Sequence, residues 1–380
     1  MEDCILSGCD VHEKTLELFA GKNAEEPERR GFAATPAGRE KLMAFLKGRA
    51  KELGASRIVM AYEAGPFGYG LYDDATAAGV ECYVLAPTRI ERSLRDRKNK
   101  TDKKDARRIL EVLRGHVLAG NDLPSVWVPD EGTREDREIV RQRLELGRTC
   151  GGVRTKIGSL LRRWDVWKPK GMGNNWTQSH RRWLVGLTGS GSVLGEWARK
   201  VLASLLRQMG FYEEELRRAD KEMLCLASRD RYRELVEELC RLKGVGELTA
   251  MVFLTEMGDL SRFKNRRQIG SYIGIAPSSH ESGEDSDRKG HITRQGSSRL
   301  RHVLCQASWV RVRCDAKEQA WYAQAAERNP KHKKIALVGS MRRLAIVMWH
   351  RALEAQEERG KAPPNLPSPN GAAGGPKGKG

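Results

Sequence analysis

Asn99-Lys100-Thr101-Asp102-Lys103-Lys104-Asp105-Ala106 places two aspartates three residues apart at the start of a predicted helix. Apolar residues at helical spacing, from Ala106 through Ile109 and Leu110 to Leu113, indicate the helix. Since residues at i and i+3 lie on the same helix face, both carboxylates can point at one spot. Lysines and arginines surround them, and two carboxylates in a basic field suggest divalent metals acting on a phosphate backbone. A solvated helix start, where Asp is favoured in the first turn, is the alternative that the octamer alone leaves open.

Composition points to a polyanionic partner. The chain has 380 residues, a length that predicts two or three domains. Its formal net charge of +18 favours binding to nucleic acid or to an anionic membrane surface. A membrane is less favoured, because no apolar run approaches ~20 residues and Glu2 and Asp3 directly follow Met1, so we expect no signal peptide. The eight cysteines contain no C-x-x-C pair, which argues against zinc and disulfides and favours a reducing cytoplasm.

Two further carboxylates stand at predicted strand ends. Residues 4–10 read as a buried strand that ends at Asp10, although Gly-x-Asp is also ordinary turn chemistry. Residues 57–62 read as a strand that runs into Glu63, and a buried charge is costly unless it is paired or binds metal. Four carboxylates from three elements can hold two Mg²⁺ ions about 3.5–4 Å apart for in-line attack on a phosphodiester.

The remaining elements of this region complete an α/β layout with a mixed sheet. We expect the order strand, strand, helix, strand, helix, strand, helix. Besides the elements already named, the pattern predicts a strand over 12–19, a helix over 37–50, a helix through residue 78 and a strand over 81–85.

The middle of the chain is predicted to be helical. Residues 131–163 and 192–239 carry apolar residues at helical spacing, as in a coiled coil or bundle. Between them, residues 164–191 combine tryptophans with basic residues, a composition suited to stacking on single-stranded bases. Alternatively, these tryptophans fill a small core.

The C-terminal part holds two motifs. Gly244-Val245-Gly246 between two helical stretches is the pattern of a helix-hairpin-helix, whose backbone amides can bind phosphate, or of an ordinary helical hairpin. The segment from 272 to 301 is dense in hydroxyls, glycines and arginines, so a serine there is a candidate nucleophile if it is activated, or a turn residue if it is not. Helical pattern resumes over 300–312 and 335–353, and the Pro/Gly/Lys composition from about residue 357 predicts a disordered tail.

In combination these segments resemble the transposases of insertion-sequence family one-ten, which have a DEDD RuvC-like domain and a separate serine-bearing C-terminal domain. The matching segments appear in the family's order to about residue 353. They are Gly8-Cys9-Asp10-Val11, Tyr62-Glu63-Ala64-Gly65, residues 99–106, Gly244-Val245-Gly246, Glu256-Met257-Gly258-Asp259, Arg262-Phe263, Gly274-Ile275-Ala276-Pro277, Glu281-Ser282-Gly283, Ile292-Thr293-Arg294-Gln295-Gly296 and Leu300-Arg301.

The resemblance implies a role for each matching residue. Asp10, Glu63, Asp102 and Asp105 correspond to the catalytic, metal-binding tetrad, with Mg²⁺ or Mn²⁺ as the metal. Ser282 corresponds to the nucleophile that forms a covalent phosphoserine link to DNA, with Ser278, Ser279 and Ser286 close by in sequence. The resemblance further implies double-stranded donor and target DNA, a structured non-coding bridge RNA, a homodimer or homotetramer, and a bacterial cytoplasmic, nucleoid-associated protein without a membrane.

We therefore expect an α/β plus mainly α protein. Its predicted parts are a RuvC/RNase H-like catalytic domain over 1–131, a helical coiled-coil region over 132–238, a mostly helical serine-bearing domain with a helix-hairpin-helix over 239–356, and a basic tail over 357–380. The residues that we expect to contact nucleic acid are Lys98, Lys100, Lys103, Lys104, Gly244, Gly246, Arg288, Lys289, Arg294, Arg299 and Arg301. The alternatives are a RuvC-like structure-specific DNA endonuclease without serine chemistry and a nucleic-acid-binding protein without enzymatic activity.

Overall fold

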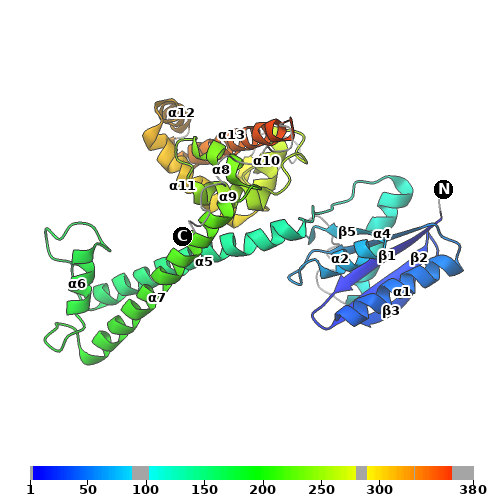
Figure 1. Ribbon diagram of the computed structural model, residues 1–380, viewed down its shortest axis with the longest axis horizontal. Helices are drawn as coiled ribbons and strands as arrows, with labels where there is room; N and C mark the ends of the chain where they lie inside the picture. Colours follow the sequence, from blue (N-terminus) through cyan, green and yellow to red (C-terminus); the bar gives the residue numbers. More distant parts are fainter. Residues whose placement is uncertain (1–2, 88–101, 280–288, 329, 362–380) are drawn as a thin grey trace, which may run out of the picture. The chain divides into compact units, whose positions relative to one another are not determined.

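The structure is a computed structural model of the chain, and it describes the backbone of residues 3–87, 102–279, 289–328 and 330–361 (Figure 1). The side chains of 102–104, 279, 289 and 359–361 are outside the described part. The chain divides into two compact units, residues 1–128 and 129–380. Each unit has its own hydrophobic cores, so each is described by itself.

A mixed five-stranded sheet forms the centre of the first unit. Its strand order is β3-β2-β1-β4-β5, in which β1 pairs antiparallel with β2 and parallel with β4. The central strands β1 and β4 are almost continuously buried, as expected for strands covered on both faces. The strands are β1 (Cys4–Val11), β2 (Thr15–Lys22), β3 (Glu28–Ala33), β4 (Arg57–Glu63) and β5 (Glu81–Leu85).

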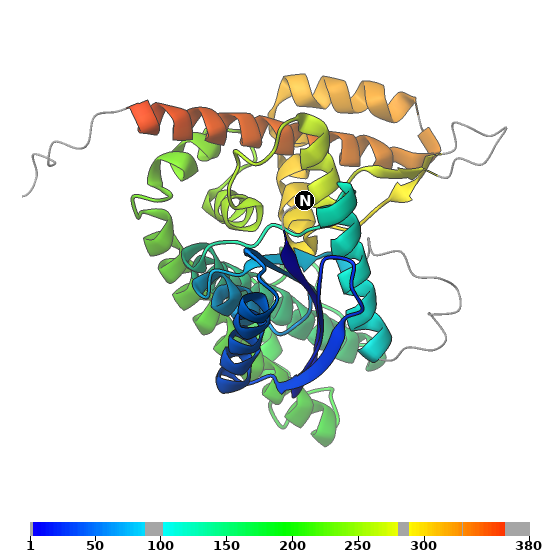
Figure 2. The same cartoon turned by 90° about the vertical axis from the view of Figure 1, so that its right-hand side faces the viewer.

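Helices cover both faces of this sheet. On one face α1 (Pro36–Glu52) and α2 (Gly70–Ala77) pack over a core that includes Ile5 and Cys9. On the other face α4 (Asp102–Ala119) packs over a core that includes Leu6. Figure 2 shows α1 and α4 on opposite sides of the strands.

The first unit follows the predicted order with one addition. The strands predicted over 4–10, 57–62 and 81–85 are confirmed, as are the helices that follow them. The second strand runs over Thr15–Lys22 rather than 12–19, because the amide of His12 bonds to the Thr15 carbonyl (2.9 Å) and closes a turn there. The edge strand β3 was not predicted, since its residues are charged and mostly exposed and show no alternation.

Two long helices dominate the first half of the second unit. The helix predicted over 131–163 is confirmed as α5 (Glu131–Arg163), and it pairs antiparallel with α7 (Glu196–Ala227). Two ion pairs join the helices, Arg143 with Asp220 (2.6 Å) and Arg154 with Glu213 (2.8 Å). The partner numbers fall along α7 as they rise along α5, as expected for antiparallel helices. A short helix, α6 (Gln178–Gly186), lies at one end of the pair (Figure 1).

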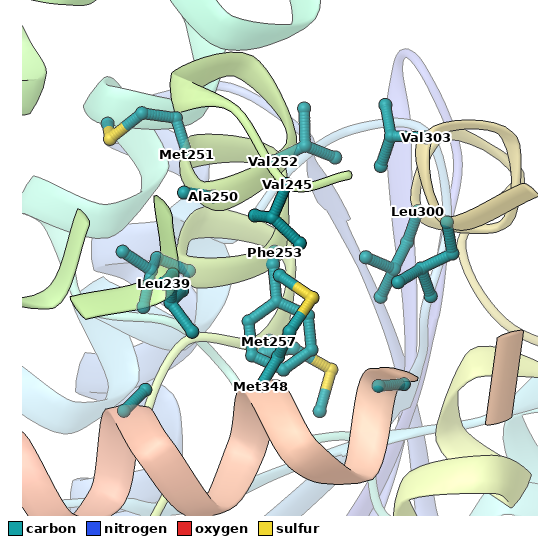
Figure 3. Packing of buried hydrophobic residues seen from close by; sticks show 14 of the residues in the cluster. Leu239, Val245, Ala250, Met251, Val252, Phe253, Met257, Leu300, Val303 and Met348 are labelled. Carbon is teal, nitrogen blue, oxygen red and sulfur yellow. The ribbon is translucent and has the colours of Figure 1, made fainter. Parts of the chain in front are cut away.

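The rest of the second unit is a helical bundle around α9, whose residues from Ala250 to Met257 are all buried. Figure 3 shows Phe253 and Met257 of α9 packed with Met348 of α13, and Val245 beside them. The elements are α8 (Arg233–Cys240), α9 (Glu247–Met257), α10 (Arg266–Ile273), β6 (Pro277–Ser279), β7 (Lys289–Ile292), α11 (Ser298–Cys314), α12 (Ala316–Glu327), η2 (Pro330–His332) and α13 (Lys333–Lys361).

Two arginines, the buried Arg137 and the partly exposed Arg141, hold α5 against this bundle. The Arg137 guanidinium donates to the carbonyl oxygens of Thr255 (2.7 Å) and Glu256 (3.2 Å) at the C-terminal end of α9. One turn further along α5, Arg141 forms an ion pair with the buried Glu256 carboxylate (2.9 Å). These contacts satisfy carbonyls that a helix end leaves without intrahelical partners.

Several elements of the second unit differ from expectation. The helix predicted over 192–239 is interrupted, because α7 ends at Ala227 and α8 begins at Arg233. The tryptophan-rich segment contains α6, and the hairpin β6–β7 and α12 were not predicted. Helix α13 continues to Lys361, past the residue where a tail was predicted to begin, and residues 362–380 are outside the described part. Among the described helices, none has the length and apolar content needed to cross a membrane.

Candidate active site

Two carboxylates stand side by side at one edge of the sheet. Because β1 and β4 are parallel and Cys9 pairs with Tyr62, Asp10 and Glu63 follow at the next position of each strand. Neighbouring strands lie about 4.8 Å apart. The two residues that the sequence predicted at separate strand ends are therefore adjacent.

Both carboxylates belong to the face of the sheet that α4 covers. Side chains alternate along a strand, so Asp10 shares its face with Leu6 and Glu63 shares its face with Val59 and Ala61. Leu6, Val59 and Ala61 all pack in the core under α4. The intervening residues Cys9 and Tyr62 belong to the opposite core, and burial there raises the pKa of the Cys9 thiol and of the Tyr62 hydroxyl above their ordinary ranges.

Helix α4 runs so that its N-terminal end is directed toward the end of β1 that holds Asp10. A Cβ atom at Gly8 would overlap the backbone of Ala106 and Leu110, so this part of α4 rests directly on β1. Further along α4, the Arg114 guanidinium donates to the Glu25 carbonyl and lies beside Gly21, which pairs with Leu6 of β1. Arg114 therefore lies near Leu6 of β1, and Ala106, eight residues earlier in α4, lies near Gly8. Because Gly8 is closer than Leu6 to Asp10, the first turn of α4 is directed toward the Asp10 end of β1.

The two aspartates of α4 occupy that first turn. Asp105 is half-buried and precedes Ala106, which is buried on the sheet. Asp102 is the first residue of α4, four positions before Ala106 and thus on the same helix face. Its side chain is outside the described part. Among the side chains that are described, no three His, Cys, Asp or Glu residues form a metal-binding group.

A histidine missed by the sequence reasoning joins the site. His12 Nε2 lies 3.0 Å from Asp10 Oδ2, in a contact that a tautomer with a proton on Nε2 makes as a donor. Residues at i and i+2 of a strand share a face, and the Asp-x-His spacing at a strand end was the available signal. The contact orients the Asp10 carboxylate at the edge of the sheet.

The donor set fits a hard divalent cation. Carboxylate oxygens are the ligands that Mg²⁺ and Mn²⁺ prefer. The described members, Asp10, Glu63 and Asp105, come from three elements of the first unit, but their described side chains do not lie close enough together to form a metal-binding group. All three carboxylates are partly exposed, and a cation between them would offset the repulsion of their like charges.

The predicted nucleophile, Ser282, is outside the described residues, but the two strands that flank it are described. β6 and β7 pair antiparallel, and Ser278 Oγ donates to the His291 carbonyl (2.9 Å) across the hairpin. At the base of the hairpin the backbones of Gly274 and Gly296 approach so closely that a Cβ at either would overlap the other strand of chain. The described chain on either side of this segment is thus tightly packed at Gly274 and Gly296.

The predicted nucleic-acid contacts divide into three groups. Gly244 packs against Ala307 of α11, where a Cβ would overlap the helix backbone, whereas Gly246 is open and begins α9 without a side-chain cap. Arg294 and Arg299 are exposed. Lys98, Lys100 and Arg288, and the side chains of Lys103, Lys104 and Lys289, are outside the described part.

Arg301 differs from the other arginines. Its Nη1 donates to the carbonyl oxygens of Ile273 (2.9 Å) and Gly296 (2.6 Å), and burial lowers the pKa of its guanidinium. The side chain therefore fastens the base of the Ser282 segment in the described structure. Arg299, two residues earlier, lines an open groove of about 700 Å³ with Glu138, Ile139, Arg141, Gln142 and Glu145 of α5.

A mixed sheet with two carboxylates on adjacent parallel strands, in a strongly basic chain, is typical of an enzyme that cuts nucleic acid. Comparison with known proteins gives the particular class. The model of the IS116/IS110/IS902 transposase family matches residues 236–323, and a model of the DEDD transposase domain of IS110 type matches residues 7–164.

Relatives match across most of the chain. The candidate transposase y4qE of Sinorhizobium fredii is 30% identical over 329 residues, covering 79% of this chain and 76% of the relative. The transposase for insertion sequence element IS1533 of Leptospira borgpetersenii is 29% identical, covering 81% and 86%. The transposase for insertion sequence element IS1111A of Coxiella burnetii is 24% identical, covering 71% of each.

The chain belongs to the IS116/IS110/IS902 family of transposases, which is the family that the sequence motifs resemble. It is an insertion-sequence transposase, an enzyme that cuts DNA, and DNA is its partner. Residues 7–164, which include most of the first unit, match a DEDD domain, the type of transposase domain that uses divalent metal ions.

Proposed function

We propose that this transposase cuts and rejoins the DNA of its insertion sequence by serine chemistry assisted by a Mg²⁺ site in a RuvC-like domain. The observation that carries the proposal is the position of Asp10 and Glu63 on adjacent parallel strands, on the face where α4 begins with Asp102 and Asp105. All four residues lie in the segment that matches the DEDD domain.

The four carboxylates hold the cation, and His12 orients the Asp10 carboxylate. When bound, Mg²⁺ neutralises charge that develops on the phosphate oxygens and on the leaving oxygen. Ser282 Oγ attacks the scissile phosphorus and loses its proton. The Oγ–P bond forms, the bond from phosphorus to the leaving deoxyribose oxygen breaks, and that oxygen gains a proton. Attack by the hydroxyl of another DNA end then reverses this exchange and releases the serine.

The basic residues and the helix-hairpin-helix hold the nucleic acids. The N-terminus of α9 at Gly246 is open and uncapped, which suits a backbone phosphate. Exposed Arg294 and Arg299 suit further phosphate contacts. A net charge of +18 supports binding of both DNA and a structured bridge RNA that selects donor and target. We propose a homodimer or homotetramer on the bacterial nucleoid, and the domain limits 1–131, 132–238, 239–356 and 357–380.

A covalent protein–DNA adduct is the direct test. The protein, with its co-purifying RNA, Mg²⁺ and labelled element ends, is expected to give a labelled band on a denaturing gel. Ser282→Ala should abolish the adduct and recombination. Ser278→Ala is the matched control, because the Ser278 hydroxyl is bonded within the hairpin and its loss should leave the adduct in place.

The acidic site is tested separately from the serine. Asp10→Asn keeps the shape of the side chain but removes its charge, and we expect Mn²⁺ binding, followed by electron paramagnetic resonance, to weaken about tenfold or more, at least the loss known for residues that only support metal ligands. Cleavage without an adduct in both wild type and Ser282→Ala would favour the alternative, a RuvC-like endonuclease without serine chemistry. Unchanged Mn²⁺ affinity in Asp10→Asn would contradict the metal site.

A further inference from the structure

The end of the α5–α7 pair that carries α6 combines exposed tryptophans with many basic residues. We call residues 156–207 the tip; it consists of the last two turns of α5, the segment with α6, and the first three turns of α7. The two family models end at residue 164 and resume at 236. Most of the tip therefore lies outside the segments that the two family models match.

The structure separates the five tryptophans of the tip into two groups. Trp176 and Trp183 pack against the small core of the tip, on either side of the buried His180, with ring centroids 5.3 and 5.4 Å from the imidazole. Trp164, Trp167 and Trp197 are instead 51%, 67% and 73% exposed. Core packing therefore explains two of the tryptophans and leaves three unexplained.

The exposed indoles are positioned rather than loose. The Trp164 ring lies against Gly195, two residues before Trp197, so these two tryptophans are close together. Trp167 Nε1 donates to Asp165 Oδ1, which ties its ring to the turn after α5. The Lys200 ammonium lies 4.3 Å from the centre of the Trp197 ring. Positioned aromatic rings lose little conformational entropy when a ligand stacks on them.

The charge of the tip indicates what such a ligand is. The tip contains ten lysines and arginines and two acidic residues, Asp165 and Glu196, so its net charge is +8. These 52 residues carry 8 of the 18 net charges of the chain. The exposed cations of the tip are Lys156, Arg162, Arg163, Lys170, Arg182, Lys200 and Arg207, and Lys200 lies over the Trp197 ring.

We propose that the tip binds an unpaired stretch of nucleic acid, with bases stacked on Trp164, Trp167 and Trp197 and phosphates held by the surrounding cations. Stacking on exposed indoles requires a free base face, which a duplex does not offer. The inference goes beyond the proposed function and does not use the acidic site or Ser282. Unpaired bases of an RNA loop and of melted DNA share this chemistry.

Two other occupants fit the surface less well. A second copy of the tip would bring two surfaces of net charge +8 together, and like charges in an interface are strongly unfavourable. An anionic membrane would satisfy the charge, but α6 has only nine residues, and most of the apolar residues of α5 and α7 in the tip pack into a shared core rather than forming a free apolar face.

The experiment measures binding by the full chain in EDTA, so that cleavage does not occur. Fluorescein-labelled 15-nucleotide oligouridine, oligothymidine and a mixed-sequence DNA duplex are titrated and followed by anisotropy. The variant Trp167→Ala/Trp197→Ala is expected to bind the two single strands about tenfold or more weakly, and the duplex unchanged. Comparing oligouridine with oligothymidine shows whether RNA or DNA is the better source of unpaired bases.

Phe211→Ala is the matched control. Phe211 is also an exposed aromatic of α7 (62% exposed), but it lies 14 residues, or about 21 Å, along the helix from Trp197. It should bind as wild type does. Ultraviolet cross-linking to oligouridine, followed by peptide mass spectrometry, should place cross-links at the tip.

Several results would overturn the inference. The first two are a loss of single-strand affinity in Phe211→Ala equal to that in the double tryptophan variant, and a loss of affinity in the double variant that is equal for duplex and single strands. The third is the absence of cross-links at the tip. The last two are a change of oligomeric state in the double variant, and binding of anionic phosphatidylserine vesicles by the wild type that the double variant loses. Asp10→Asn separates this inference from the proposed function, because that variant should lose cleavage but keep single-strand binding.

Discussion

Gly8 is the residue on which the geometry of the acidic site most depends. A Cβ atom there overlaps backbone atoms of Ala106 and Leu110, and backbone cannot move aside as a flexible side chain can. Gly8→Ala should therefore displace α4 from the sheet and lower the free energy of unfolding by about 1–3 kcal/mol or more. Chemical denaturation followed by circular dichroism measures this change.

Gly48→Ala is the control for that substitution. Gly48 lies inside α1, and nothing lies within 4 Å of the position that a Cβ atom would take, so alanine there meets open space. Because alanine is the better helix former, Gly48→Ala should stabilise the protein by roughly 0.5–1 kcal/mol. If Gly8→Ala were as stable as wild type, α4 would not rest on β1 as described.

Individual site residues could be predicted from the sequence where they stand at the end of a predicted strand or the start of a predicted helix. Asp10 and Glu63 end two buried strands, and parallel pairing of those strands makes them neighbours. Nothing in the sequence says that β1 and β4 are neighbours in the sheet, because this depends on the non-local strand order. His12 was assigned to the second strand, and its contact with Asp10 appears only once the turn before Thr15 is known.

At the scale of elements, α6 depends on a neutral histidine. His180 Nδ1 accepts a hydrogen bond from the Trp176 amide (3.1 Å), which only an unprotonated Nδ1 can do. Burial, followed by the charges of Lys168 and Arg181, lowers the pKa of His180 below its ordinary value of 6.5. The Arg154 guanidinium and the Glu213 carboxylate complete the charged groups around this core.

The sign of the pH effect follows from that lowered pKa. Above 6.5 His180 is neutral in both folded and unfolded chains, whereas below 6.5 only the unfolded chain readily takes the proton. We expect the tip to lose stability as the pH falls from 7.5 to 5, seen as a change in near-ultraviolet circular dichroism of the tryptophans. His180→Gln removes the titrating group and should flatten this part of the profile; an unchanged profile would count against the contact.

Regular elements were predictable and interrupted ones were not. The spacing of apolar residues in 131–163 gave the limits of α5, because a long amphipathic helix carries many repeats. The break between α7 and α8 lacks Gly and Pro, and Ala227 and Tyr232 continue the apolar pattern across it. β3 is an exposed edge strand, so burial left no pattern in its sequence.

At the scale of the whole molecule, the hydrophobic cores follow the two units. The cores of the first unit end at Val128, and those of the second begin at Ile139 and Val140, so no described core contains residues from both. The sequence suggested several domains from length alone, but it could not say which cores are continuous, since that depends on contacts between distant segments. Separate cores imply separate cooperative unfolding.

Calorimetry of the full chain should accordingly show more than one unfolding transition. Gly8→Ala is expected to lower the midpoint of a transition that belongs to the first unit and to leave the others in place. Phe253→Ala removes a fully buried side chain from the core around α9, at about 3–5 kcal/mol, and should lower a different transition. If both substitutions shifted one common transition by similar amounts, the units would unfold together, and the acidic site and the serine-bearing segment would share one stability rather than two.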